Sequence, residues 1–125
     1  MNGVTLDAGA LIAFDRNDRA VVAVVRRAVE RGLTLVVPAG VVGQVWRDGR
    51  RQVRLARLLA SEAVHVETLD DARARAAGQL CGVRGTGDVI DASVVLCARS
   101  RGQAVLTSDI DDLRRLDPSI EFIRV

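Results

Sequence analysis

Two runs of this chain are apolar except for one threonine, without the polar–apolar alternation of a half-buried strand. They are LTLVV at residues 33–37 and AVL at residues 104–106. Strands of this kind are buried on both faces, which is typical of parallel sheets covered by helices on both sides. Helical patterns separate these strands, and alternating strands and helices imply βαβ units. We therefore predict an α/β fold, a three-layer α/β/α sandwich around a central parallel sheet of about five strands.

The other elements follow from the same patterns. Further strands are expected at residues 4–6, 63–69 and 121–125, and the AVL run belongs to a strand over residues 103–107. Helical patterns begin after Asp7 and continue at residues 20–31, 41–61, 70–82, 88–102 and 109–116. The pattern at 41–61 forms either one helix or two helices broken near residues 48–49. Gly32 stands where a helix C-cap is expected.

The 125 residues, of which 49% are hydrophobic, predict one domain over residues 1–125 with a mainly aliphatic core. No apolar run approaches the roughly 18 residues needed to cross a bilayer. The N-terminus also lacks the charged and long apolar segments of a secretion signal. We expect a cytoplasmic protein without a membrane partner, in which Cys81 and Cys97 are core thiols rather than a disulfide or a metal pair.

Three acids have positions that call for an explanation. Asp7 follows the first strand and Asp109 follows the strand at 103–107, although each also suits the N-cap of the next helix. Asp91 lies in the nearly apolar helix TGDVIDASVVLC, one turn inside its start, where an ionised carboxylate is costly without a partner. Sites in such folds form at the carboxyl ends of strands. We expect Asp7, Asp91 and Asp109 to gather at one edge of the sheet.

Two more acids accompany these three. Asp88 shares a helical face with Asp91, and it also suits a first-turn acid that complements the helix dipole. Asp112 closes a capping box or joins Asp109 and Asp111 in a cluster whose members repel one another without a cation. Carboxylates without Cys or His ligands select a hard cation, Mg²⁺ or Mn²⁺. Such an ion activates water and neutralises the charge that develops in phosphodiester cleavage.

The sequence lacks the residues that other catalytic mechanisms require. The single histidine, His65, lies in the strand at 63–69, far in sequence from the acids, and a general-base role is not expected. There is no nucleophilic Ser elbow, Cys–His pair or CxxC motif, and the glycines of GVRGTGD follow a helix instead of a strand, unlike a dinucleotide site. All 18 basic residues are Arg. The absence of Lys excludes receiver-like and phosphatase domains that need a catalytic Lys.

Five arginines recur at intervals of three or four residues and predict one stripe on a helix. They are Arg47, Arg50, Arg51, Arg54 and Arg57. Only Asp48 lies near them in sequence, so they repel one another unless a polyanion or an acidic partner lies against them. The stripe is either a contact surface for RNA or a protein partner, or a solvated helix face. For RNA binding we select Arg47, Arg50 and Arg54.

The segments LDAGALIAF, DASVVLCARSRG and LTSDIDDL, in this order and at this spacing, resemble the PIN domain. They resemble most the VapC-type toxin ribonucleases of bacterial toxin–antitoxin pairs, over essentially the whole chain. The resemblance implies a homodimer that uses Mg²⁺ or Mn²⁺, held by about four acids, to cleave RNA into 3′-hydroxyl and 5′-phosphate ends. It also implies a VapB-type antitoxin that wraps the toxin and inserts an Arg into the acidic site.

The family's acids map onto three positions of this chain: Asp7, Asp91 and Asp109, with Asp112 close by. The fourth acid, normally a Glu on the helix after the second strand, is replaced by Gln44. An amide coordinates or contacts substrate through its carbonyl oxygen but contributes no charge. Either Asp88 supplies the missing charge, or the protein is a PIN-like RNA- or partner-binding module with weak or no nuclease activity.

Overall fold

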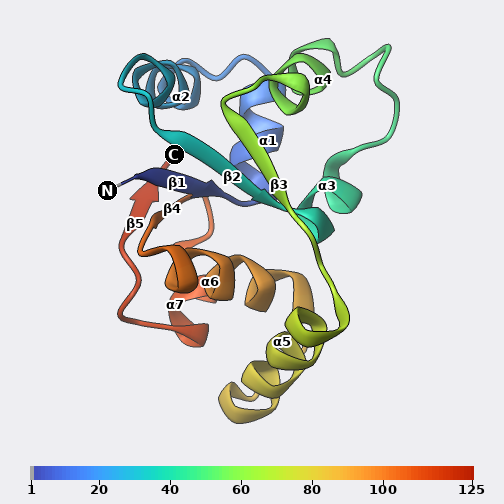
Figure 1. The fold of residues 1–125 in the computed structure, drawn as a ribbon, viewed down its shortest axis with the longest axis vertical. Coiled ribbons are helices and arrows are strands. Elements are labelled where there is room, and N and C mark those ends of the chain that lie inside the picture. Colours follow the sequence, from blue (N-terminus) through green and yellow to red (C-terminus); the bar gives the residue numbers. More distant parts are fainter. Residues whose placement is uncertain (1) are drawn as a thin grey trace.

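The computed structural model describes residues 2–125. It contains one parallel sheet with the strand order β3–β2–β1–β4–β5 (Figure 1). The strands are β1 (Gly3–Leu6), β2 (Thr34–Pro38), β3 (Val64–Glu67), β4 (Ala104–Thr107) and β5 (Phe122–Arg124). Every pairing between neighbours is parallel. The predicted α/β class and the sheet of five strands are confirmed.

Helices cover both faces of this sheet (Figure 1). The helices on one side are α1 (Ala8–Asp15), α2 (Arg19–Glu30) and α4 (Val53–Ala60). Those on the other side are α5 (Asp71–Arg84), α6 (Val89–Arg101) and α7 (Ile110–Leu116). The short α3 (Ala39–Val45) follows β2 and packs against α1 and α6. None of the helices in residues 2–125 is long and apolar enough to cross a membrane.

The core is aliphatic, as the composition predicts. Both β1 and β4 are buried along their whole length, whereas the edge strands β3 and β5 are only half-buried. The apolar runs therefore form the central strands, which have helices on both faces. Cys81 and Cys97 are buried and unbonded, as core thiols are expected to be. Gly32 follows the C-cap of α2 with φ of +72°, a conformation that glycine adopts without strain.

Of the two forms predicted for residues 41–61, the structure has the second, two helices. The helical pattern at residues 41–61 forms two helices separated by residues 46–52, a longer break than the one near residues 48–49. Gln52 explains the interruption, because its amide oxygen accepts from the backbone N–H groups of Arg47 (2.8 Å) and Asp48 (3.0 Å). Its amide nitrogen donates to the carbonyl of Val45 at 2.7 Å. One glutamine side chain thus replaces several helical hydrogen bonds at the end of α3.

Candidate active site

Asp7 lies at the carboxyl end of β1, beside the carboxyl end of β4. Its side chain is the N-cap of α1 and accepts from the N–H of Ala10 at 2.9 Å. Its second oxygen accepts a hydrogen bond from the Thr107 hydroxyl. Asp7 is only 6% exposed, and this burial raises its pKa despite the hydrogen bonds that oppose the shift. Asp7 is therefore both a cap and a buried carboxylate at the expected edge.

Thr107 is a residue that the sequence analysis missed. It is the last residue of β4 and is fully buried. Its hydroxyl oxygen accepts from the N–H of Asp109 at 2.8 Å, so its single proton is free to bond Asp7. The hydroxyl thereby links the turn that carries Asp109 to the Asp7 carboxylate. A hydroxyl residue ending an otherwise apolar strand, just before two polar residues, is the signal that identifies it.

The start of α6 corrects the prediction for Asp91. Asp88, not Thr86 or Gly87, is the N-cap, and its oxygen accepts from the N–H of Asp91 at 2.9 Å. Asp91 therefore lies in the first turn of the helix instead of one turn inside it. The helix dipole still favours a negative charge at this position. The position of Asp91 along the helix thus does not by itself require a cation, unlike the groups that surround its carboxylate.

The groups around Asp91 oppose the ionisation of its carboxyl group. Burial raises the pKa of Asp91 to about 7, together with the nearby carboxylates of Asp88, Asp7 and Asp109. Burial and the carboxyl group of Asp112 raise the pKa of Asp109, and the charge of Asp7 adds to this shift. Electrostatic repulsion therefore acts on Asp91 from three other acids, and on Asp109 from Asp112 and Asp7. None of them forms an ion pair with any residue in the described part of the chain, 2–125.

The donor chemistry of this cluster fits a hard divalent cation, because every side chain offers carboxylate oxygens. As the side chains stand, no three acidic, His or Cys groups among residues 2–125 converge on a ready-made cation position. Asp88, Asp109 and Asp112 are exposed and project from the first residues of helices. Exposed side chains change rotamer on the nanosecond timescale or faster. A cation bound by this cluster would therefore need these exposed side chains to turn toward it.

Gln44 is exposed on α3, a helix that packs against α6. Gly40 lies one turn earlier and packs directly on Ile90, since a Cβ at Gly40 would lie 2.4 Å from the Ile90 Cδ1 atom. Ile90 immediately precedes Asp91 in the chain. The absence of a side chain at Gly40 thus lets α3, and with it Gln44, approach the acid-bearing turn of α6.

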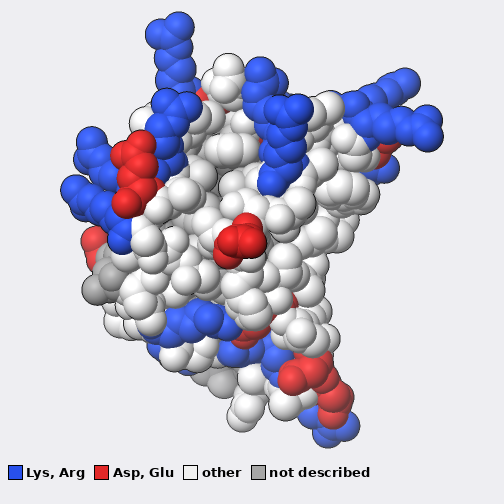
Figure 2. All heavy atoms as spheres, turned by 45° about the horizontal axis from the view of Figure 1, so that its top comes forward, with Lys and Arg blue, Asp and Glu red and all other residues white. Residues whose placement is uncertain are grey.

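The predicted arginine stripe does not lie on one helix. Only Arg54 and Arg57 belong to α4, and the other three lie in the segment 46–52. The Arg47 guanidinium donates to the backbone carbonyls of Gly43 (3.2 Å) and Trp46 (2.7 Å), and Arg51 lies 3.9 Å from Asp48. Arg50 and Arg54 are exposed and form no ion pair within residues 2–125. Figure 2 shows basic side chains projecting around the end of the molecule that carries α2 and α4.

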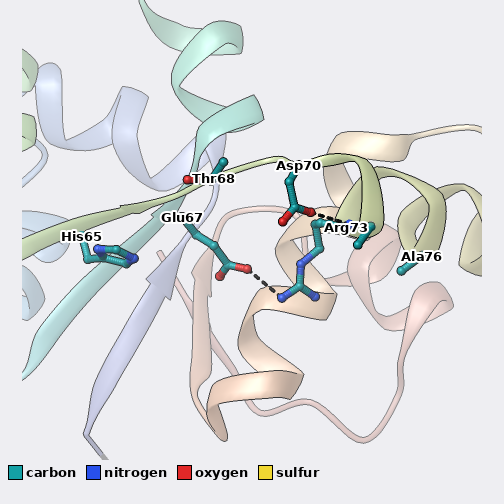
Figure 3. Close-up of a pocket in the computed structure, with 7 residues that line it drawn as sticks. His65, Glu67, Thr68, Asp70, Arg73 and Ala76 are labelled. Carbon is teal, nitrogen blue, oxygen red and sulfur yellow. Dashed lines mark hydrogen bonds and ion pairs between the residues drawn. The ribbon is translucent and has the colours of Figure 1, made fainter.

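A second carboxylate lies at the same edge of the sheet but in a different environment. Glu67, at the end of β3, accepts from Arg73 at 2.7 Å and from Arg101 at 3.2 Å. It lines an open hollow of about 490 Å³ together with His65 and residues from the start of α5 (Figure 3). None of the five clustered acids lines this hollow. His65 belongs to this hollow, as expected for a residue without a role at the acids.

Comparisons with known proteins agree with this fold. Residues 4–118 match the PIN domain. Among solved structures, the fold is similar to VapC20 of Mycobacterium tuberculosis, a Sarcin-Ricin loop cleaving toxin, with a TM-score of 0.72, 19% identity and coverage of 98% of this chain and 100% of that one. It is also similar to VapBC2 of Rickettsia felis bound to a promoter DNA fragment (TM-score 0.71, 13% identity, 98% of both chains).

A third similar structure is FitAcB of Neisseria gonorrhoeae, with a TM-score of 0.66, 15% identity and coverage of 97% of this chain and 96% of that one. At these identities the three structures establish a shared fold. No curated protein sequence matches the chain.

Proposed function

The chain belongs to the PIN domain family, and from that premise we propose that it is a metal-dependent ribonuclease toxin that hydrolyses RNA phosphodiester bonds. The observation that carries this proposal is the carboxylate cluster near the ends of β1 and β4, in which burial and the charges of neighbouring acids raise the pKa of Asp91 to about 7. Carboxylates held together without a cationic side chain bind a divalent ion that offsets their charge. Nuclease chemistry is the use of such a site that the fold supports best.

In this proposal Asp7, Asp91 and Asp109 are the catalytic carboxylates and hold Mg²⁺ or Mn²⁺, with Asp88 and Asp112 as additional ligands. The ion supplies an activated water and neutralises charge on the cleaved phosphate. The chain's own part is to orient the carboxylates. The hydroxyl of Thr107 and the N–H of Ala10 each hold one oxygen of Asp7, which fixes that carboxylate in position.

The substrate and partners follow from the same family premise. Arg47, Arg50 and Arg54 contact the RNA backbone, and the Gln44 amide contacts substrate near the acids. A VapB-type antitoxin neutralises the toxin, a proposal supported by the likeness to VapBC2 and FitAcB. Residues 1–125 act as one domain and form a homodimer in the cytoplasm, where RNA and antitoxin meet the protein. The likeness to VapC20 makes a ribosomal RNA loop the first substrate to try.

The direct test is RNA cleavage by Asp7→Asn and Asp91→Asn proteins in Mg²⁺ or Mn²⁺. Loss of one ligand removes several kcal/mol of transition-state stabilisation, so each variant should cleave more than about 100-fold more slowly. Asp111→Asn is the matched control, because Asp111 is an exposed acid in the first turn of α7. Full activity in both site variants would overturn the proposal.

A second function, RNA or partner binding with little or no cleavage, is favoured by Gln44, which leaves the site one charge short. Thermal unfolding during Mn²⁺ titration separates the two functions. An ion that binds the folded state raises the melting temperature according to RT ln(1 + [L]/Kd). A nuclease requires this rise, and Asp91→Asn should reduce it. RNA binding without a rise in melting temperature would favour the binding module.

A further inference from the structure

A hollow of about 390 Å³ lies directly beside the acidic cluster. Its inner end is formed by Gly9 and Ser108, which follow Asp7 and precede Asp109 in the chain. A Cβ at Gly9 would lie 2.3 Å from the Ser108 Oγ atom and 3.6 Å from an oxygen of Asp7. The turns that carry Asp7 and Asp109 therefore touch at Gly9 and Ser108, which both line the hollow.

The walls of the hollow are apolar. Ile12 and Ala13 of α1 form part of the lining, together with Val125, which follows β5. Ile12 is 40% exposed, although most of the large aliphatic side chains of this chain are buried. The volume falls within the range of about 300–1,000 Å³ that is typical of small-molecule sites.

The charged side chains at the hollow are one arginine and one aspartate that caps a helix. Arg16 lines it, is exposed, and forms no ion pair within residues 2–125. The carboxylate of Asp18 also lines it, but one of its oxygens accepts from the N–H groups of Ala20 (3.0 Å) and Val21 (3.2 Å) at the start of α2. Ser108 adds an exposed hydroxyl that donates and accepts hydrogen bonds.

We propose that this hollow is the subsite for the nucleotide next to the cleaved RNA bond. The base lies between Ile12 and Val125 with its edge at the Ser108 hydroxyl, and the Arg16 guanidinium pairs with a phosphate of the same strand. An Arg fork matches phosphate geometry in a two-point contact. An RNA strand whose phosphate lies at Asp7 must place a neighbouring nucleotide close by. This inference rests on the proposed ribonuclease function and assigns it a base-selecting pocket.

The test uses single-stranded RNA oligonucleotides that differ in the bases on either side of the cleaved bond. Arg16→Ala should raise KM about tenfold with little change in kcat, because one charged contact to phosphate is lost. Ile12→Ala should reduce the discrimination among flanking bases. Arg26→Ala and Val29→Ala are the matched controls, since both residues are exposed on α2 and neither lines the hollow.

A binding measurement keeps this inference separate from the nuclease itself. The same oligonucleotides are bound to Asp91→Asn protein, and fluorescence anisotropy measures affinity with and without Arg16→Ala. If the wild-type protein fails to cleave any RNA, the proposed function fails, but a tenfold loss of affinity still supports the subsite. Unchanged RNA affinity and unchanged base preference in both hollow variants would overturn it, even where they weaken binding of a protein partner.

Discussion

Two carboxylate sites at one edge of the same sheet have opposite electrostatics. Glu67 at the end of β3 is partly buried, and burial by itself raises its pKa, but hydrogen bonds from Cys97 and Arg101 and the charge of Arg73 bring it below the usual value. Asp91, near the ends of β1 and β4, experiences burial together with the charges of other acids, and its pKa rises to about 7. One site contains its own cations, and the other contains none.

This difference shows what the acidic cluster lacks. The chain has 18 arginines and uses two of them to neutralise Glu67. A third, Arg99, pairs with the buried carboxylate of Asp117 at 2.9 Å. Buried acids elsewhere in the molecule thus have arginine partners, whereas Asp7 and Asp91 have none within residues 2–125. This lack of arginine partners is the contrast that supports the proposed cation site.

The largest expected effect is on thermal stability, which one neutralising substitution should lower and the other should raise. Glu67→Gln removes charge-assisted hydrogen bonds to two arginines. It should therefore lower the free energy of unfolding by about 2 kcal/mol and the melting temperature by roughly 5–10 °C. Asp91→Asn removes repulsion and should raise the melting temperature in metal-free buffer at pH 8. Thermal unfolding measures both, and Glu62→Gln at an exposed position is the control. Equal destabilisation by both variants would contradict the contrast between the sites.

The dependence of stability on pH should also differ between the sites. The pKa of Asp91 is about 7 in the folded state against 3.8 for an ordinary Asp, so the folded protein binds more protons between these values. The contribution of Asp91 to stability is therefore complete below about pH 4 and is lost as pH rises through 7. Glu67 has a lowered pKa, so its contribution is present above 4.5 and is lost in acid.

Urea unfolding in chelator from pH 5 to pH 8 measures this dependence. The free energy of unfolding should fall over this range in the wild-type protein and much less in Asp91→Asn. Mn²⁺ at pH 8 should restore stability, because a metal binds the deprotonated carboxylates. A slope that Asp91→Asn leaves unchanged would assign the proton uptake to other groups.

The sequence predicts the sheet and the approach of Asp7 to Asp109 because both depend on chain-local patterns. Apolar runs identify the buried strands, and parallel strands bring their carboxyl ends to one edge. Three features depend on side-chain contacts that the hydrophobic periodicity of the sequence does not predict. They are the Gln52 side chain that separates α3 from α4, the Thr107 hydroxyl that links two acids, and the choice of Asp88 as the helix cap. Each results from one side chain bonding backbone or side-chain groups outside the regular pattern.

The smallest expected effect on stability is at Asp88, which has two opposing roles. Its cap hydrogen bond to the N–H of Asp91 favours folding by about 1 kcal/mol, whereas its charge raises the pKa of Asp91 and opposes folding. Asp88→Ala loses both and should change stability little. Asp88→Asn keeps the capping oxygen, removes the charge, and should stabilise the metal-free protein by a few tenths of a kcal/mol. Thermal unfolding of the two variants at pH 8 measures this difference.

Cleavage assays then decide whether Asp88 supplies the charge that Gln44 does not. If it does, Asp88→Asn should reduce cleavage about tenfold or more, and Gln44→Glu in the same protein should restore part of it, because the second substitution returns the lost carboxylate to the site. Gln44→Ala alone should then have the smaller effect. An inactive Gln44→Ala protein beside a fully active Asp88→Asn protein would show instead that the amide takes part in catalysis and that Asp88 is only a helix cap. The double variant separates these outcomes. If Asp88 is only a helix cap, Asp88→Asn loses no cleavage activity that Gln44→Glu could restore.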